Sequence, residues 1–375
     1  MPTLHTIATC LAIAGLSAGP ARADQVLYVA TTQGKTIATY EVNGDSGELS
    51  KIFSVDLPGE TDSLAYSPDT SFLYAAVSKL GDNRSGVATF GRATDGSLEV
   101  LKTVTINGPA PYICADKTGR YLLAAHYYTG EVAVYRIVDG VCTDEVVDIK
   151  KTTTTAHCIE VDPSGRFVFV PHTAPNKVYQ FRLDCHSGKL IPNDPPFVDG
   201  PDKDHKYHGP RHYAHHPMLN VAYTSNEAGG GITAWRFDHQ TGTLSQYQTL
   251  STLPPDFEGT SFAADIHLTP DGRFAYVSNR DQTPRDDSDP GKATLAGFAV
   301  DPKTGLMRPI GFFPTGKTPR SFCIDVTGHF LYAADQSSGT LFAYRIDPQT
   351  GELERIATYE TDPGPVWVLC GKVRR

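Results

Sequence analysis

The chain has 375 residues, with 33 Lys or Arg against 42 Asp or Glu, and therefore a formal net charge of −9. This acidic balance argues against nucleic acid as a partner, and the hydrophobic share of 40% excludes a disordered chain. The 34 Gly, 27 Pro, 18 Tyr and 17 Phe favour a β protein that is rich in turns.

The first segment reads as an export signal. An apolar stretch from Leu4 to Ala18 is followed by Ala21-Arg22-Ala23, which has the A-x-A pattern of a cleavage site. We therefore expect a signal peptide over residues 1–23, a mature domain over 24–375 and a periplasmic location; the alternative is an N-terminal helix. No later segment has the ~20 apolar residues that a spanning helix needs, so we expect no membrane insertion after cleavage.

Cleavage would remove Cys10 and leave six cysteines, and their pairing stays open. They are Cys114, Cys142, Cys158, Cys185, Cys323 and Cys370. No C-x-x-C motif occurs among them, so neither a redox dithiol nor a zinc finger is indicated. Disulfide bridges and buried free thiols are both compatible with this pattern.

An internal repeat dominates the rest of the chain. Its clearest copies are Gly165–Phe169, Gly272–Tyr276 and Gly328–Tyr332, and weaker copies end at Tyr28, Tyr74, Leu123 and Tyr223. The ends of consecutive units are 46 to 56 residues apart, which makes seven units. Each unit continues with a second alternating run and a glycine turn, as in Leu341–Ile346 followed by Thr350-Gly351. Such alternation bounded by turns predicts about four antiparallel strands per unit.

Seven four-stranded units predict an all-β fold, a seven-bladed β-propeller that forms one domain. The first unit lacks an incoming strand, whereas Pro365–Cys370 reads as a strand without a unit. We expect this C-terminal strand to complete the first blade and close the ring. Two β-sandwiches are the alternative architecture, but they leave this complementarity unexplained.

Two positions in each unit break the repeat, and they predict the functional site. Twelve residues before the aligned aromatic position lie Asp62, Pro111, His157, Arg211, Ala264 and Arg320. Four residues after it lie Ser78, Tyr127, Thr173, Glu227, Arg280 and Gln336. Positions that build blades should repeat, whereas these vary and are rich in ionisable groups, as expected at the ligand face of a propeller.

We therefore expect one group of these residues to converge at one mouth of the channel: His157, Arg211, Glu227, Arg280 and Arg320. A supporting layer would comprise Asp265, His212, His172, Asn226, Asn279 and Asp335. Three arginines suit an anion or a developing oxyanion, and a histidine with a glutamate can move protons. The alternative is a structural ion-pair network around the channel.

Five histidines lie close together in the sequence and suggest a metal site as one interpretation: His205, His208, His212, His215 and His216. On a strand, His212 and His216 would point one way and His215 the other. Loop and supporting roles are the better interpretation, and no metal is predicted.

The segments that carry these residues resemble those of a known family. Tyr207–Pro217 together with Ala222–Glu227 is similar to the G-P-R-H…H-P…N-E signature of the propeller lactonases. Ala263–Arg273, Ser278–Arg280 and Thr318–Ser321 match the next two blades of that family. The family includes bacterial propeller-type 6-phosphogluconolactonases and fungal carboxy-cis,cis-muconate cyclases. The resemblance implies a lactone-processing site without a cofactor, in which the family's histidine, two arginines and glutamate fall on His157, Arg211, Arg280 and Glu227.

The resulting hypothesis is hydrolysis of a small-molecule lactone. The phosphate-handling members of the family are cytosolic, so export favours glucono-1,5-lactone over 6-phosphogluconolactone. The expected catalytic residues are His157, Glu227, Arg211 and Arg280, and the expected substrate-binding residues are Arg320, His212, Asp265 and His172. Arg211 and Arg280 would stabilise the oxyanion, while His157 and Glu227 would share the proton transfers. Cycloisomerisation of a carboxymuconate and a noncatalytic, exported binding propeller are the alternatives.

Overall fold

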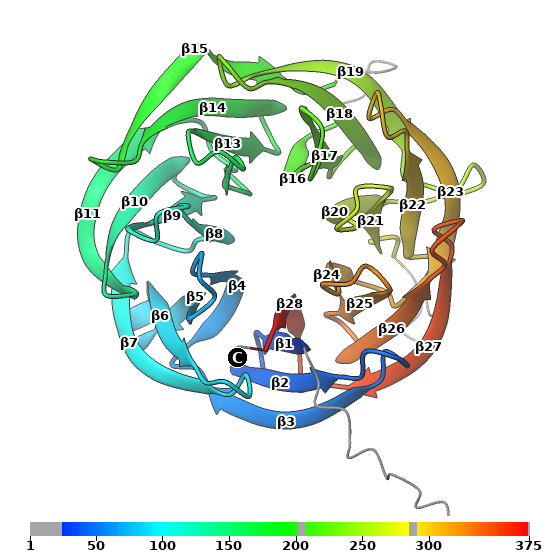
Figure 1. Ribbon diagram of the computed structural model, residues 1–375, viewed down its shortest axis with the longest axis horizontal. Helices are drawn as coiled ribbons and strands as arrows, with labels where there is room; N and C mark the ends of the chain where they lie inside the picture. The colour runs from blue at the N-terminus through cyan, green and yellow to red at the C-terminus, as the bar shows by residue number, and fades with distance from the viewer. Residues whose placement is uncertain (1–24, 202–207, 285–290, 374–375) are drawn as a thin grey trace, which may run out of the picture.

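The computed structural model describes residues 25–201, 208–284 and 291–373. The predicted signal peptide and His205 lie outside the described residues. The strands form seven four-stranded antiparallel sheets, arranged as blades around a central axis (Figure 1). The predicted seven-bladed, all-β propeller is thereby confirmed.

Each blade uses four strands that follow one another in the chain, except the first, which takes its innermost strand from the C-terminus. The first three blades comprise β28 (Pro365–Lys372), β1 (Gln25–Thr31), β2 (Thr36–Val42), β3 (Leu49–Asp56); β4 (Glu60–Tyr66), β5 (Phe72–Leu80), β6 (Arg84–Arg92), β7 (Leu98–Ile106); and β8 (Tyr112–Ala115), β9 (Tyr121–His126), β10 (Glu131–Val138), β11 (Val141–Lys151). The fourth and fifth comprise β12 (Glu160–Val161), β13 (Phe167–His172), β14 (Lys177–Asp184), β15 (Lys189–Asp199); and β16 (Pro210–His215), β17 (Val221–Asn226), β18 (Gly231–Asp238), β19 (Thr243–Ser251). The last two comprise β20 (Ser261–Leu268), β21 (Phe274–Asp281), β22 (Thr294–Val300), β23 (Met307–Pro314); and β24 (Pro319–Ile324), β25 (Phe330–Asp335), β26 (Thr340–Ile346), β27 (Leu353–Glu360). A 3-10 turn, η1 (Gly81–Asn83), joins β5 to β6.

The C-terminal strand closes the ring. β28 pairs antiparallel with β1, with Val26 opposite Gly371 and Tyr28 opposite Leu369. It is the innermost strand of the first blade (Figure 1). The predicted completion of the first unit is confirmed, and it ties the two ends of the domain together through backbone hydrogen bonds.

The tyrosine that ends a repeat unit fastens its blade to the next one. The Tyr332 hydroxyl donates to the Gly47 carbonyl at 2.9 Å, across the junction between the last and first blades. The same bond recurs in the pairs Tyr28–Gly96, Tyr74–Gly140, Tyr223–Gly305 and Tyr276–Gly351. Gly47 has φ +78°, and a Cβ there would lie 2.3 Å from the Phe330 ring, so only glycine fits the turn. The repeat is therefore the signature of the contact between blades.

Apolar side chains fill the space between neighbouring blades. At the closing junction, for example, Leu27 and Val29 of β1 pack in one buried cluster with Phe330 and Tyr332 of β25. Because this packing uses the faces of the sheets, the ends of the inner strands remain available for a site. Within the part of the chain that the structure describes, no helix has the length and apolarity to cross a membrane.

Candidate active site at the channel mouth

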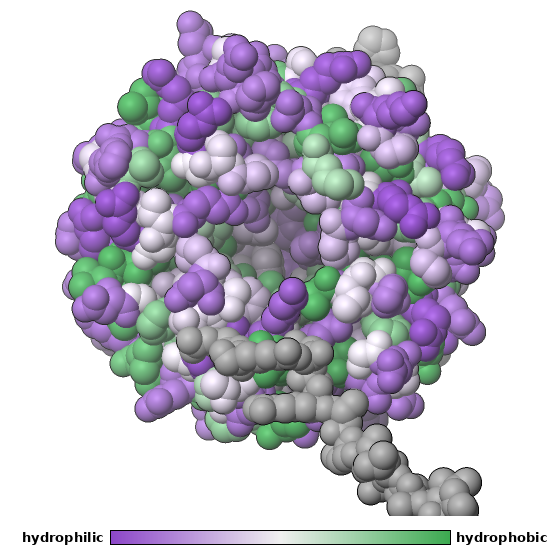
Figure 2. Space-filling model, viewed as in Figure 1, coloured by the Kyte–Doolittle hydropathy of each residue, from purple (hydrophilic) through white to green (hydrophobic). Residues whose placement is uncertain are grey.

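The innermost strands begin, and the second strands end, at the same end of the channel because the two are antiparallel. A cavity of about 690 Å³ opens there, and we call it the large cavity. It is lined by Asp62, Ser78, Lys79, Asn83, Ser85, Pro109, Pro111, Tyr127, Tyr128, His157, Glu227 and Arg320. Figure 2 shows the ring hollowed at its centre. Seven of these lining residues stand at the two positions where the repeat breaks, so spacing alone located the cavity.

A clamped carboxylate forms one wall of the large cavity. Glu227 Oε1 lies 2.5 Å from Arg280 Nη2 and 3.3 Å from Arg211 Nε. Arg211 and Arg280 are 1% and 7% exposed, and neither lines the cavity, so they stand behind Glu227 and hold it. Burial by itself would raise the pKa of Glu227, but the charges of Arg211 and Arg280 outweigh it and hold this pKa below its ordinary value. Glu227 is therefore ionised at neutral pH.

The third arginine is placed differently. Arg320, in β24, lines the large cavity, and among the described residues no carboxylate lies within ion-pair distance of it. The guanidinium of Arg320 can therefore pair with a ligand in the cavity, whereas Arg211 and Arg280 are already paired with Glu227. We call the unpaired charge of Arg320 the open charge. Arginine is suited to this task because its planar donors match a carboxylate or an oxyanion.

His157 lies just before β12 and reaches the cavity wall with a buried ring. Its backbone N–H donates to the Pro171 carbonyl at 3.0 Å, and the residue is 5% exposed. Its Nδ1 has no hydrogen-bond partner within the described part of the chain. Burial first, and then the charge of Arg211, hold the pKa of His157 well below its ordinary value. The imidazole is therefore neutral, with one ring nitrogen unused.

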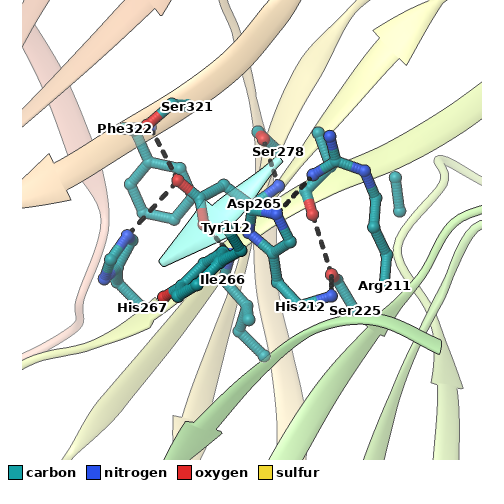
Figure 3. Close-up of polar contacts among 12 residues, drawn as sticks. Tyr112, Arg211, His212, Ser225, Asp265, Ile266, His267, Ser278, Ser321 and Phe322 are labelled. Atoms are coloured by element: carbon teal, nitrogen blue, oxygen red, sulfur yellow. Dashed lines mark hydrogen bonds and ion pairs between the residues drawn. The ribbon is translucent and has the colours of Figure 1, made fainter. Parts of the chain in front are cut away.

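A buried network beneath the cavity supports Arg211 (Figure 3). Arg211 Nη1 donates to His212 Nε2 at 3.0 Å, since arginine can only donate, and His212 Nδ1 then donates to Asp265 Oδ1 at 2.8 Å. Asp265 also accepts from the Phe322 backbone N–H and lies 3.3 Å from His267 Nε2. Burial, then Arg211, lowers the pKa of His212 to about 4, so this ring is neutral and its tautomer is set.

Asp265 is the charged centre of this network. Burial would raise its pKa, but His267 and His212 outweigh burial and hold the pKa of Asp265 well below its ordinary value. In return, Asp265 raises the pKa of His267 against the opposing effect of burial. His212 and Asp265 do not line the large cavity, so the structure places them as supports of Arg211 rather than against a ligand.

His172 lies away from the large cavity. Its Nδ1 is 3.1 Å from the Thr154 carbonyl, and its ring packs on Tyr179 at a centroid distance of 4.7 Å. The residues at the equivalent strand end are likewise buried and hydrogen-bonded, to the same blade or to the loop that precedes it: Asn226, Asn279 and Asp335. This position fastens the neighbouring loop, and only for Asn226 among these four does the next residue, Glu227, line the large cavity.

Some cavity residues were not selected from the sequence. Asp62, Ser78, Pro111 and Tyr127 stand at the two positions where the repeat breaks, although the predicted site comprises arginine, histidine and glutamate residues. For Asp62 the signal was present, because it occupies the same place in its unit as His157, Arg211 and Arg320. Other residues come from η1 and nearby loops, where the repeat offers no guide: Asn83, Ser85, Pro109 and Tyr128.

The described histidines of the predicted cluster make separate local contacts and do not converge on one point. His216 Nδ1 accepts from the backbone N–H groups of Met218 and Leu219, while the His215 ring packs against Phe237 at 5.1 Å. Over the described ranges, no group of three or more His, Cys, Asp or Glu could hold a metal ion.

The fold and the site together define a class: a seven-bladed propeller with an arginine-clamped carboxylate and an open arginine at the mouth of its channel. Residues 26–370 match the family described as "Lactonase, 7-bladed beta-propeller", and the chain belongs to that family. It is 31% identical over 347 residues to a 6-phosphogluconolactonase of Enterobacter sp. (strain 638), covering 92% of this chain and 98% of that protein. It is 32% identical over 345 residues to a 6-phosphogluconolactonase of Serratia proteamaculans (strain 568), with the same coverage.

Solved structures agree with this assignment. The periplasmic gluconolactonase PpgL of Pseudomonas aeruginosa superposes with a TM-score of 0.81 at 25% identity, covering 93% of this chain and 99% of that one. The family resemblance seen in the sequence is thereby confirmed.

Proposed function

We propose that this protein hydrolyses a sugar lactone to its aldonic acid in the large cavity. The observation that carries the proposal is the open charge of Arg320 in the same cavity as the ionised, clamped Glu227. Membership of the lactonase family and the names of the relatives support this reaction.

The charges suit the transition state of lactone opening. Water attacks the carbonyl carbon, and the carbonyl oxygen becomes an oxyanion that Arg320 would stabilise; a lost donor in such a site costs about 10²–10³ in turnover. Glu227 would orient the attacking water through its carboxylate. Arg211 and Arg280, which contact Glu227, would act by holding it and by adding positive potential, and the neutral His157 would bind a sugar hydroxyl.

The arrangement favours a lactone without a phosphate. The cations that line the large cavity are Arg320 and Lys79, and Lys79 is already paired with Glu60 at 2.9 Å. One open arginine suits an uncharged lactone that develops a single negative charge, whereas a phosphate is usually met by several cationic or backbone donors. We therefore propose glucono-1,5-lactone as the substrate.

We further propose that the protein is exported to the periplasm. The predicted signal peptide and the similarity to a periplasmic gluconolactonase support this location. Fractionation of a bacterial host that expresses the full chain should recover a periplasmic protein that begins at Asp24.

The test of the reaction is proton release from glucono-1,5-lactone in weak buffer, measured above the spontaneous rate. Wild type should accelerate opening, and Glu227→Gln should lose at least a hundredfold, because the ionised carboxylate that orients water is gone. Glu354→Gln, an exposed carboxylate on β27, is the matched control and should keep the wild-type rate. Absence of acceleration by wild type, with turnover of carboxymuconate instead, would replace hydrolysis by cycloisomerisation.

A further inference from the structure

The proposed hydrolysis needs a group that takes a proton from water near neutral pH, and the two expected carriers are poorly matched to that task. Glu227 is held ionised by two arginines, and His157 is held neutral with a pKa well below its ordinary value. Both are therefore weak bases. An effective acid–base group has a pKa close to the working pH.

Asp62 is the other carboxyl group on the wall of the large cavity. It lies in β4, the innermost strand of the second blade, while Glu227 follows β17 in the fifth. Its Oδ2 is buried without a hydrogen-bond partner among the described residues. A buried carboxyl oxygen without a partner is costly, and here it belongs to a side chain that lines a cavity, where a ligand or water can satisfy it.

The surroundings of Asp62 tune it for proton transfer. Burial raises its pKa, while the nearby Ser78 hydroxyl and the charge of Arg320 oppose burial, and the result is a value of about 6. Glu60 adds a smaller raising effect, and Lys79 adds a smaller lowering one. The pKa of Asp62 is thus raised while that of Glu227 is lowered. In hydrolases with two acidic residues, such a difference in pKa assigns a different role to each residue.

We propose that Asp62 is a catalytic acid–base residue of the large cavity, an assignment that rests on the proposed lactone hydrolysis. Its carboxylate takes a proton from water as the water oxygen bonds to the carbonyl carbon and the carbonyl electrons move to the oxyanion. The oxyanion then re-forms the carbonyl, the bond to the ring oxygen breaks, and Asp62 returns its proton to that oxygen. One water is consumed, and one hydroxy acid is formed, which ionises in solution.

The pH profile tests this role directly. Asp62 must be ionised to act as a base, so kcat/KM of the wild type should fall as pH drops through about 6. Asp62→Asn should lose 10²–10⁴-fold and should no longer show this limb. Glu60→Gln, on the same strand, is the matched control. It should keep the rate at pH 7.5 and move the limb to lower pH, because it removes a charge that raises the pKa of Asp62.

The outcomes separate the two proposals. A wild type that does not accelerate lactone opening removes the proposed reaction. If wild type accelerates the reaction and Asp62→Asn stays within threefold of it with the same acidic limb, the catalytic role of Asp62 is overturned but lactone hydrolysis stands. Thermal unfolding of Asp62→Asn distinguishes lost chemistry from lost structure. If that variant is unfolded, an unshifted limb in Glu60→Gln still overturns the assignment.

A second inference comes from a different observation at the closing junction of the ring. Cys323 in β24 and Cys370 in β28 have their sulfur atoms 3.3 Å apart, on the innermost strands of the last and first blades. Cys323 is buried, and Cys370 is partly exposed, so a small oxidant can reach the pair from one side. β28 is held in its own sheet by pairing with β1 alone.

We infer that Cys323 and Cys370 form a disulfide that latches the closing strand to the last blade. The two thiols lose two protons and two electrons to a disulfide oxidant, which is reduced to two thiols, and one S–S bond forms. The bridge joins residues 47 positions apart, long enough to restrict the unfolded chain appreciably. It would act precisely where only non-covalent contacts join the ends of the domain.

Treatment of the purified full chain with oxidised glutathione tests the latch. A non-reducing digest should yield the peptide pair carrying Cys323 and Cys370, and the Tm should exceed that of the reduced protein by about 5 °C. Cys370→Ser should abolish both effects, whereas Cys185→Ser, at another partly exposed thiol, should abolish neither. Recovery of both peptides as free thiols, or an unchanged Tm after bridging, would overturn the inference.

Discussion

The two ends of the channel treat charge in opposite ways. At the far end, where the innermost strands finish, a smaller cavity of about 260 Å³ is lined by residues that include Tyr112, Glu160 and His267. There the carboxyl groups are paired, since Tyr112 donates to Glu160 at 2.5 Å and His267 pairs with Asp265, although the neutral Tyr213 hydroxyl and His215 Nε2 have no partner among the described residues. In the large cavity, by contrast, Arg320 has no ion-pair partner among the described residues, and Asp62 and His157 keep unused polar atoms.

This difference indicates that, in a scaffold of repeated blades, charged groups without a partner mark the functional site. Unpaired charges cost stability, so a fold retains them where a ligand completes them, whereas paired charges contribute to structure. The comparison predicts that changes in the large cavity alter activity with little effect on stability. Changes in the buried network of His212 and Asp265 should lower stability more than they lower activity.

The largest effect is expected at Arg320. Arg320→Met should lower kcat/KM for the lactone by about 10²–10³-fold, because it removes the open donor for the oxyanion. The Tm should stay close to that of wild type, since no described carboxylate loses a partner. Steady-state kinetics and thermal unfolding check both statements. Activity within tenfold of wild type would contradict the functional reading of the open charge.

The next effect is expected at Asp265, and mainly in stability. Asp265→Asn removes the carboxylate that accepts from His212 and attracts His267, and losing a buried hydrogen bond to a charged group costs about 1.5–3 kcal/mol in the free energy of unfolding. Its effect on activity should be smaller than that of Arg320→Met, because it acts through His212 and Arg211. Urea unfolding measures the cost. Asp271→Asn removes the charge of an exposed pair with Arg273 but keeps an oxygen that can accept from Thr269 and the Arg273 backbone, so it should change the free energy of unfolding little.

The last prediction concerns pH and the buried histidines. Burial lowers the pKa of His172, His212 and His215 to about 4 each. Between pH 6.5 and 4 the unfolded chain binds protons that the folded chain does not. The free energy of unfolding should therefore fall with falling pH, by about 1.4 kcal/mol per pH unit for each histidine. Asp62, with its raised pKa, acts in the opposite sense and offsets part of this loss.

One substitution isolates the histidine effect. His215→Phe keeps a ring among Phe169, Tyr213 and Phe237 and removes one titrating group. Urea unfolding between pH 7 and 4.5 should show a shallower pH dependence for this variant by the share of one histidine. An unchanged slope would mean that His215 does not titrate between the two states.

Much of the architecture was predictable from local patterns. Strand alternation and the spacing of the Tyr332-type units identified seven blades, because each unit repeats the same inter-blade contact. The position of the cavity followed from where the units differ. His172 does not line the cavity because its ring is taken up by the Thr154 carbonyl and by packing on Tyr179. Such a contact depends on the loop before the blade, which strand spacing does not predict.

The sequence by itself determined the seven blades, the strand that closes the ring and the strand ends where chemistry collects, because period and spacing are properties of short segments. Only the tertiary structure decided that Arg211 and Arg280 hold Glu227 while Arg320 stays open. It also decided that Asp62 keeps an unpartnered oxygen on the cavity wall. These properties depend on distances between side chains of different blades, and burial and pairing across those distances set which charges are used in structure and which remain for a substrate.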